Sequence, residues 1–175
     1  PGNTPAVKVE GTRGFGGGAV EIRIEGRDYD DSERLSHEFE LASGRTFVHP
    51  FNDPGIIAGQ GTVAAELLRE APDIANIVVP VGGGGLACGI ALHAKSINPA
   101  IRVIGVQPET SAPFMHSMRA GGYVKTHIGD SVADALTGDI ISEEFLKFFL
   151  NNVDEVAAVS EEEIDKAAEL AVKWS

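Results

Sequence analysis

The sequence predicts an α/β fold in which helices cover both faces of a parallel β-sheet. Segments with a helical spacing of apolar residues alternate along the 175 residues with short apolar runs that are typical of buried strands. One such run, residues 74–81, leads into four successive glycines and then into another helical segment. Because parallel strands need crossover helices that pack back onto the sheet, this alternation indicates a three-layer architecture.

The elements are predicted in a regular order. Helices are expected over residues 6–15, 30–42, 62–70, 86–97 and 112–120, and strands over residues 19–24, 46–49, 74–81 and 101–106. Acidic residues that follow Ser142 and Ser160 are typical of two more helix starts, the second of them a capping box. Residues 50–61 are rich in proline, glycine, asparagine and aspartate, and we expect a crossover between two domains there.

The four glycines lie where a strand is predicted to turn into a helix. Without Cβ atoms the backbone can turn sharply, and its N–H groups can converge on an anion at the positive end of the helix. This arrangement predicts a phosphate-binding loop formed by Gly82, Gly83, Gly84, Gly85 and Leu86. The alternative is that the glycines form only a tight turn.

The same glycines partly match a dinucleotide-binding pattern. Gly82, Gly84 and Ala87 fit G-x-G-x-x-A, so a nicotinamide or flavin site has to be considered. That pattern also requires an acidic residue at the end of the next strand, where it binds a ribose hydroxyl. Gln107 stands there and Glu109 follows two residues later, so the match is incomplete.

Residues 47–62 carry the most specific motif of the chain, FVHPFNDPGIIAGQGT. Together with the glycine run that follows, this segment closely resembles the threonine dehydratase and serine racemase branch of the fold-type II pyridoxal-phosphate enzymes. Further matches occur at residues 106–109, 131–136, 153–156 and 159–164, so the resemblance covers nearly the whole chain. The glycine loop followed by Leu86 is similar to the dehydratase branch, whereas the cysteine synthase branch usually carries threonine within its loop.

This resemblance implies a tryptophan synthase β-like fold with pyridoxal phosphate as cofactor, its phosphate held by residues 82–86. Residues 1–49 are then the C-terminal part of a small domain, and residues 50–175 are part of a large domain. The activity implied for the intact protein is that of a threonine/serine dehydratase, an ammonia-lyase that converts a hydroxy amino acid to a 2-oxo acid and ammonia, in a homo-oligomer. Two alternatives stay open: a serine racemase-like enzyme, and a non-catalytic α/β module that binds a nucleotide or another phosphate metabolite.

Some features of the family have no counterpart in this sequence. The Schiff-base lysine motif, Ser-Phe-Lys-x-Arg-Gly in type, does not occur, and the six lysines stand in unrelated contexts. Pro1 is not an initiator methionine, and the helical spacing near Ser175 continues without a terminating glycine or proline. We therefore expect a fragment of a longer enzyme that contains no catalytic residue of its own and is inactive as an isolated chain.

Three positions depart from the family pattern. Gln107 and Pro113 replace the acidic residues with which some members bind a divalent cation, so no metal site is predicted. Ala135 replaces a glycine that lies close to the cofactor ring in the family, where a methyl group could crowd the ring.

The composition favours a cytoplasmic protein that binds a small molecule. A formal net charge of −12 argues against nucleic acid or an anionic membrane surface as a partner. No apolar run approaches the length of about 20 residues that a bilayer span requires. A single cysteine, Cys88, excludes an intramolecular disulfide, and we expect it to be buried against the sheet. The five histidines show no zinc-ligand spacing, and we expect His49 to shape a turn near the domain crossover.

Overall fold

The computed structural model describes residues 1–140 and 142–174. The chain divides into two compact units, Pro1–Val48 and His49–Ser175. This division lies next to the predicted boundary at residue 49. That the two units correspond to the small and the large domain of the family stays a prediction.

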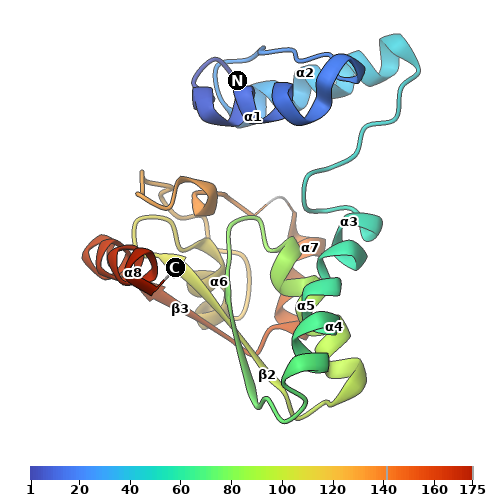
Figure 1. Cartoon of the computed structure of the whole chain (residues 1–175). Helices are drawn as coiled ribbons and strands as arrows, with labels where there is room; N and C mark the ends of the chain where they lie inside the picture. The colour runs from blue at the N-terminus through green and yellow to red at the C-terminus, as the bar shows by residue number, and fades with distance from the viewer. Residues whose placement is uncertain (141, 175) are drawn as a thin grey trace. The chain divides into compact units, whose positions relative to one another are not determined.

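The first unit contains two helices joined by an extended segment (Figure 1). They are α1 (Ala6–Gly16), which continues into the short 3₁₀ turn η1 (Gly17–Ala19), and α2 (Tyr29–Ser43). The carboxylate of Asp28 accepts a hydrogen bond of 2.9 Å from the N–H of Asp31 at the start of α2. Gly44 ends α2 with a left-handed φ of 69°. Both helices predicted in this unit are confirmed.

The strands predicted over residues 19–24 and 46–49 are wrong. The backbone at Val20 is extended, with φ −113° and ψ 125°, but neither segment pairs with another strand within the described residues. An extended segment becomes part of a sheet only when a neighbour supplies its backbone hydrogen bonds. The local pattern detects the extended conformation but carries no information about the missing partner.

The second unit is built on a parallel sheet of three strands in the order β1-β2-β3. The strands are β1 (Asn76–Pro80), β2 (Arg102–Pro108) and β3 (Glu155–Val159). Val79 of β1 lies opposite Gly105 of β2, which in turn lies opposite Val156 of β3. The strands predicted over residues 74–81 and 101–106 are confirmed, and with them the α/β fold class. The pattern of the sequence predicts no strand at β3.

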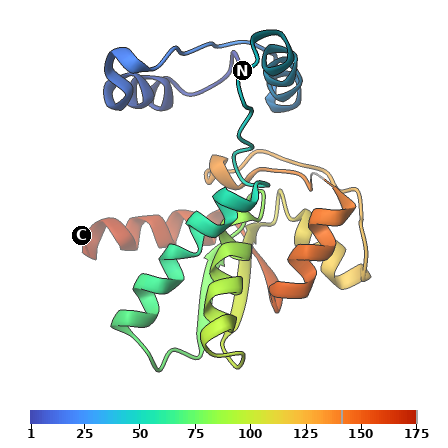
Figure 2. The same ribbon diagram turned by 90° about the vertical axis from the view of Figure 1, so that its right-hand side faces the viewer.

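Helices lie on both sides of this sheet. On one side lie α3 (Pro54–Gln60), α4 (Thr62–Glu70), α5 (Gly85–Ile97) and α7 (Glu143–Asn152), and on the other side lies α8 (Glu161–Trp174) (Figure 1 and Figure 2). A further helix, α6 (Pro113–Ala120), packs against β3. The helices predicted over residues 62–70, 86–97 and 112–120 are confirmed, as are the helix starts after Ser142 and Ser160.

Helix α3 lies inside residues 50–61, where the composition predicts only an interruption of the pattern. The Asp53 carboxylate accepts hydrogen bonds from the N–H groups of Gly55 (2.7 Å) and Ile56 (3.1 Å). Pro54 occupies the first turn, where a missing N–H costs nothing. The helix therefore starts from a local capping signal that the glycine and proline content of the segment obscures.

The core of the second unit lies between the sheet and the helices beside it. Its buried side chains include Val79, Val81, Ala87, Cys88, Ala91, Val103, Phe114 and Phe149. Helix α5 approaches α3 closely at Gly89, because a Cβ atom there would overlap the carbonyl oxygen of Ile57 and lie 2.9 Å from the Cβ atom of Gln60. Cys88 is fully buried, as predicted, and burial raises the pKa of its thiol to about 12.

One face of β1 is open. Ile77 and Val79 are buried, whereas Val78 between them is 65% exposed. The prediction of a strand buried on both faces is therefore wrong for β1, since the described residues leave its outer face largely in contact with solvent.

Candidate functional site

The glycine run forms the turn between β1 and α5, as the sequence predicts. Val81 follows β1 and its N–H donates to the carbonyl of Val106 at 2.8 Å, which holds the start of the turn to β2. Gly84 caps α5 with φ 88° and ψ −11°, a left-handed conformation that other residues rarely adopt. The turn thus lies at the carboxyl end of a parallel strand, where open α/β sheets bind their ligands.

The backbone N–H groups of this turn form a row of hydrogen-bond donors. The first helical bond of α5 runs from the N–H of Cys88 to the carbonyl of Gly84, at 3.0 Å. Within the described residues, no acceptor is assigned to the N–H groups of residues 82–87. Since the N-terminus of a helix also carries a partial positive charge, this row is suited to an anion such as a phosphate group.

Packing against neighbouring segments explains why the turn consists of glycines. A Cβ atom on Gly83 or Gly85 would overlap Phe51, and one on Gly82 would lie 2.7 Å from the carbonyl oxygen of Ala135. At Gly84 a Cβ atom would face three aromatic rings of the core, those of Phe145 at 3.0 Å, Phe149 at 3.1 Å and Phe114 at 3.2 Å. The Cβ positions therefore point at protein atoms, and side chains would push these neighbours away from the turn.

The segment of residues 133–138 forms one side of the site. It contains the short turn η2 (Asp134–Leu136) and ends at Gly138. A Cβ atom added at Gly138 would lie 3.6 Å from backbone atoms of Gly82 and Gly83, so the two segments lie close together. Ala135, which replaces the glycine expected from the family, is exposed, and its φ is not positive. Its methyl group is thus accommodated by the backbone of this segment.

Phe51 forms another side, and His49 sets its direction. The Nδ1 atom of His49 accepts hydrogen bonds from the N–H groups of Phe51 (3.2 Å) and Asn52 (2.9 Å). The two rings meet edge to face, with centroids 4.6 Å apart. His49 therefore shapes the turn that presents Phe51 to the glycines, which agrees with the role predicted from the sequence.

Gln107 has a structural role that the sequence reasoning missed. Its side chain is fully buried, and its Oε1 atom accepts hydrogen bonds from the N–H groups of Phe114 and Met115, both at 3.1 Å. Its Nε2 atom donates to the carbonyl of Val81 at 3.4 Å. Gln107 thus caps the first turn of α6 and ties β2 to the glycine turn. An amide side chain at the end of the strand predicted over residues 101–106, shortly before Pro113 at the start of a helix, is the sequence signal that could have indicated this cap.

The position of Gln107 also argues against a metal site and against a dinucleotide-binding site. With its oxygen bound by α6 and its nitrogen directed at Val81, this side chain is unsuited to a cation or to a ribose hydroxyl. Across the described part of the chain, no group of three or more His, Cys, Asp or Glu side chains is placed to hold a metal ion.

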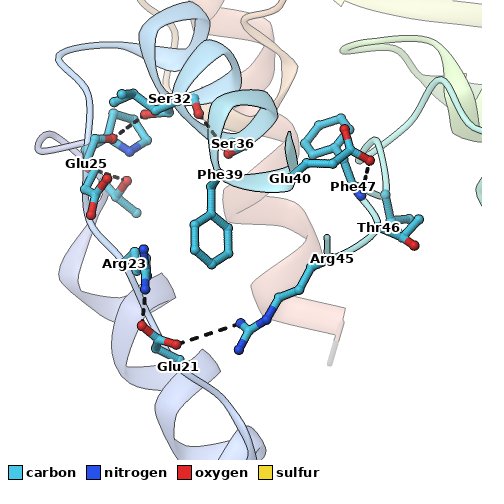
Figure 3. A pocket seen from close by; sticks show the side chains of 14 residues that line it. Glu21, Arg23, Glu25, Ser32, Ser36, Phe39, Glu40, Arg45, Thr46 and Phe47 are labelled. Atoms are coloured by element: carbon cyan, nitrogen blue, oxygen red, sulfur yellow. Dashed lines mark hydrogen bonds and ion pairs between the residues drawn. The ribbon is translucent and has the colours of Figure 1, made fainter. Parts of the chain in front are cut away.

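The first unit contains a cavity of about 550 Å³ between α2 and the extended segments, lined by both charged and apolar side chains (Figure 3). The guanidinium of Arg23 lies 4.2 Å from the centre of the Phe39 ring and donates to Glu21 at 2.8 Å. Arg45 approaches the same carboxylate to 3.8 Å. Glu21 thus pairs with both arginines, and none of the predicted phosphate-binding residues lines this cavity.

Comparison with known proteins identifies the family. Residues 1–173 match the family model described as pyridoxal-phosphate dependent enzyme. The chain belongs to this family. The resemblance drawn from the sequence motifs is thereby confirmed.

Relatives in this family are similar to the chain along almost its whole length. An L-threonine ammonia-lyase of Thermotoga maritima is 39% identical over 171 residues, which cover 95% of this chain and 41% of that protein. A biosynthetic L-threonine dehydratase of Burkholderia multivorans is 41% identical over 160 residues, or 91% of this chain and 32% of that protein. The chain therefore spans less than half the length of these relatives.

Solved structures of the family confirm the fold. Maize serine racemase matches with a TM-score of 0.86 and 33% identity over 94% of this chain and 51% of that one. The processed form of threonine deaminase isoform 2 from Solanum lycopersicum matches with a TM-score of 0.80 and 32% identity over 91% of this chain and 46% of that one. The predicted fold-type II architecture is thereby confirmed.

Proposed function

We propose that this chain is part of a pyridoxal-phosphate-dependent ammonia-lyase that acts on threonine or serine. The observation that carries the proposal is the row of N–H donors at residues 82–87, which have no assigned acceptor among the described residues and stand at the N-terminus of α5. This row occurs in a chain of the pyridoxal-phosphate family whose relatives include L-threonine ammonia-lyases.

Within this proposal Gly82, Gly83, Gly84, Gly85 and Leu86 bind the phosphate of the cofactor. Backbone N–H groups and the helix dipole stabilise a phosphate without a cationic side chain. The close contacts of Phe51 with Gly83 and Gly85 support one side of the turn. The contribution of the chain is thus to bind and orient the cofactor through its phosphate.

The bond-breaking chemistry is supplied by the cofactor when it is bound, because pyridoxal phosphate is an electron sink for a carbanion formed at the amino-acid α-carbon. We assign no catalytic residue to this chain. Lys95 donates to Asp154 at 2.7 Å, and Asp154 precedes β3, so this lysine lies near the amino ends of the strands. The glycine turn lies at their carboxyl ends, which leaves Lys95 without a role in the chemistry.

A serine racemase-like enzyme is the second candidate, because maize serine racemase matches with a TM-score of 0.86. Both reactions begin with the loss of the α-proton, so the phosphate-binding turn serves either of them. A module that binds a dinucleotide is disfavoured, because Gln107 replaces the acidic residue of that pattern and its polar atoms are bound inside the protein.

We also propose that the protein forms a homo-oligomer and is cytoplasmic. Both proposals rest on the sequence alone. The described helices include none that combines the length and the apolar character needed to cross a membrane.

Titration of the chain with three compounds tests the phosphate assignment. We expect pyridoxal phosphate to bind more tightly than pyridoxal, which lacks the phosphate, and NAD to bind weakly or not at all. Calorimetry or protein fluorescence measures each affinity. Equal affinities for pyridoxal phosphate and pyridoxal would show that the turn does not hold the phosphate, and preferential binding of NAD would favour the dinucleotide reading.

A further inference from the structure

Glu161 is the first residue of α8, and the sequence places it among the acidic residues of a capping box. The predicted capping box is confirmed, and Glu163 is the acidic residue that completes it. The Oε2 atom of Glu163 accepts hydrogen bonds from the N–H (2.8 Å) and the hydroxyl (3.0 Å) of Ser160, and the N–H of Glu163 donates back to that hydroxyl at 3.3 Å. Glu161 is therefore not needed for the cap.

The carboxylate of Glu161 instead joins two segments that are remote in the sequence. Its Oε1 atom accepts a hydrogen bond from the hydroxyl of Thr110 at 3.2 Å, in the loop after β2. Its Oε2 atom accepts one from the N–H of Val132 at 2.9 Å and one from the hydroxyl of Ser131 at 3.1 Å. The hydrogen bond from Val132 lowers the pKa of Glu161 below its ordinary value. Partial burial opposes this shift, and the hydrogen bonds from Ser131 and Thr110 add to it. The carboxylate is therefore charged at neutral pH, and both of its oxygens are used.

The segment attached to Glu161 continues directly to the glycine turn. The hydroxyl of Ser131 accepts a hydrogen bond from the N–H of Ala133 at 3.1 Å, and the carbonyl of Ala133 accepts one from the N–H of Leu136 at 2.8 Å. These bonds fold the chain so that the carbonyl of Ala135 faces Gly82. The segment of residues 131–138 is thus tethered at one end by Glu161 and lies against the turn at the other.

We propose that Glu161 is a positioning residue for the phosphate-binding turn: it holds residues 131–138 against Gly82 and Gly83 and so keeps the N–H donors in place. This inference rests on the proposed function of the turn. A carboxylate suits this task because it accepts several hydrogen bonds at once, and charge-assisted bonds are stronger than neutral ones.

The neighbouring residue offers a matched control. Glu162 lies on the same first turn of α8, but its carboxylate pairs with Lys166 at 2.6 Å in a solvent-exposed contact. Glu162→Ala removes the same charge and the same side-chain atoms from the same helix end without touching residues 131–138. A difference between variants at the two positions therefore reports the tether and not the helix dipole.

The experiment compares Glu161→Ala and Glu162→Ala with the wild type in two measurements. Hydrogen exchange of the backbone amides is expected to become faster over residues 131–138 in Glu161→Ala only. The affinity for pyridoxal phosphate is expected to fall by about tenfold in Glu161→Ala, the scale of losing one hydrogen bond to the phosphate. The affinity for pyridoxal is expected to stay the same. Glu161→Gln keeps one acceptor oxygen, so its affinity for pyridoxal phosphate is expected to lie between those of the wild type and Glu161→Ala.

Unchanged exchange over residues 131–138 in Glu161→Ala would overturn the tether. Faster exchange without a loss of affinity would overturn its role in cofactor binding. If wild type itself binds pyridoxal phosphate no better than pyridoxal, the proposed function fails, while the exchange measurement still decides whether Glu161 holds the segment. Should Glu161→Ala not fold, as judged by circular dichroism, Ser131→Ala removes one of the donors and is expected to show the same pattern in weaker form.

Discussion

The side-chain nitrogen of Gln107 lies 3.4 Å from the carbonyl oxygen of Val81, and this contact ties the end of β2 to the residue that precedes the glycine turn. The oxygen of the same amide binds the first turn of α6. One buried side chain therefore fixes the turn relative to both the sheet and a helix. A glutamate at this position could accept from the helix, but once ionised it could not donate to Val81.

Gln107→Glu is therefore expected to destabilise the protein by about 1–3 kcal/mol at neutral pH, because it leaves a carbonyl oxygen without its donor and places a charge in the core. Urea unfolding followed by circular dichroism measures the change in the free energy of unfolding. Wild-type stability in this variant would show that the contact with Val81 contributes nothing.

Gly84→Ala is expected to be more damaging than Gly121→Ala. Both glycines have a positive φ, 88° and 71°, so alanine is strained at each by about 1–2 kcal/mol. At Gly84 the methyl group would also meet the rings of Phe145 and Phe149 at 3.0 and 3.1 Å, whereas nothing lies within 4 Å at Gly121. We expect an additional loss of about 1–3 kcal/mol at Gly84 from overpacking, measured as the difference between the two unfolding free energies. Equal losses would show that the core yields to the methyl group.

The contact between Lys95 and Asp154 predicts a pH dependence of stability. Burial alone would raise the pKa of Asp154, but hydrogen bonds from Lys95 and the N–H of Val103 outweigh it and hold the pKa below its ordinary value. A carboxyl group with a lowered pKa in the folded state stabilises the fold above its unfolded pKa of about 3.9, and this contribution is lost as the pH falls through the folded value.

The stability difference between wild type and Asp154→Asn is therefore expected to be constant from pH 7 to about 5 and to shrink below about pH 4. Glu155→Gln is the control, because Glu155 pairs with Arg102 at 2.8 Å in a contact whose side chains are both 53% exposed. We expect that pair to contribute less than about 1 kcal/mol to the free energy of unfolding. A difference for Asp154→Asn that grows toward low pH would contradict the assignment.

Cys88 is expected to be unreactive in the folded protein. Its side chain is buried, and burial raises the pKa of the thiol to about 12, so the reactive thiolate is scarce at neutral pH. A chromogenic thiol reagent should label the native chain at least roughly 100-fold more slowly than the urea-unfolded chain, in line with opening of a stable core. Prompt labelling under native conditions would show that the start of α5 is accessible.

The 175-residue chain, supplied with pyridoxal phosphate and threonine or serine, is expected to release no 2-oxo acid above the level that the free cofactor produces. The physical reason is that the sequence lacks the family's Schiff-base lysine motif, so no positioned base removes the α-proton. A coupled dehydrogenase assay measures the product. Saturable turnover in proportion to the protein concentration would disprove this prediction and locate a base within the chain.

The sequence by itself determined the features that depend on neighbouring residues. The turn at residues 82–85 and the start of α5 follow from an apolar strand, successive glycines and a helical spacing, all within a short stretch. The same motifs indicated the family to which the chain belongs. Helix α2 was predictable for the same reason, since its cap at Asp28 and its end at Gly44 are local signals.

Only the tertiary structure decided the features that need a distant partner. Residues 19–24 and 46–49 read as strands but do not form them, because a strand is completed by hydrogen bonds from another segment. The roles of Gln107 and Glu161 likewise depend on Val81 and Ser131, which folding brings to them from elsewhere in the chain. A carboxylate or an amide looks the same in a sequence whether water or a buried N–H group binds it, and the physical difference arises only when the chain has packed.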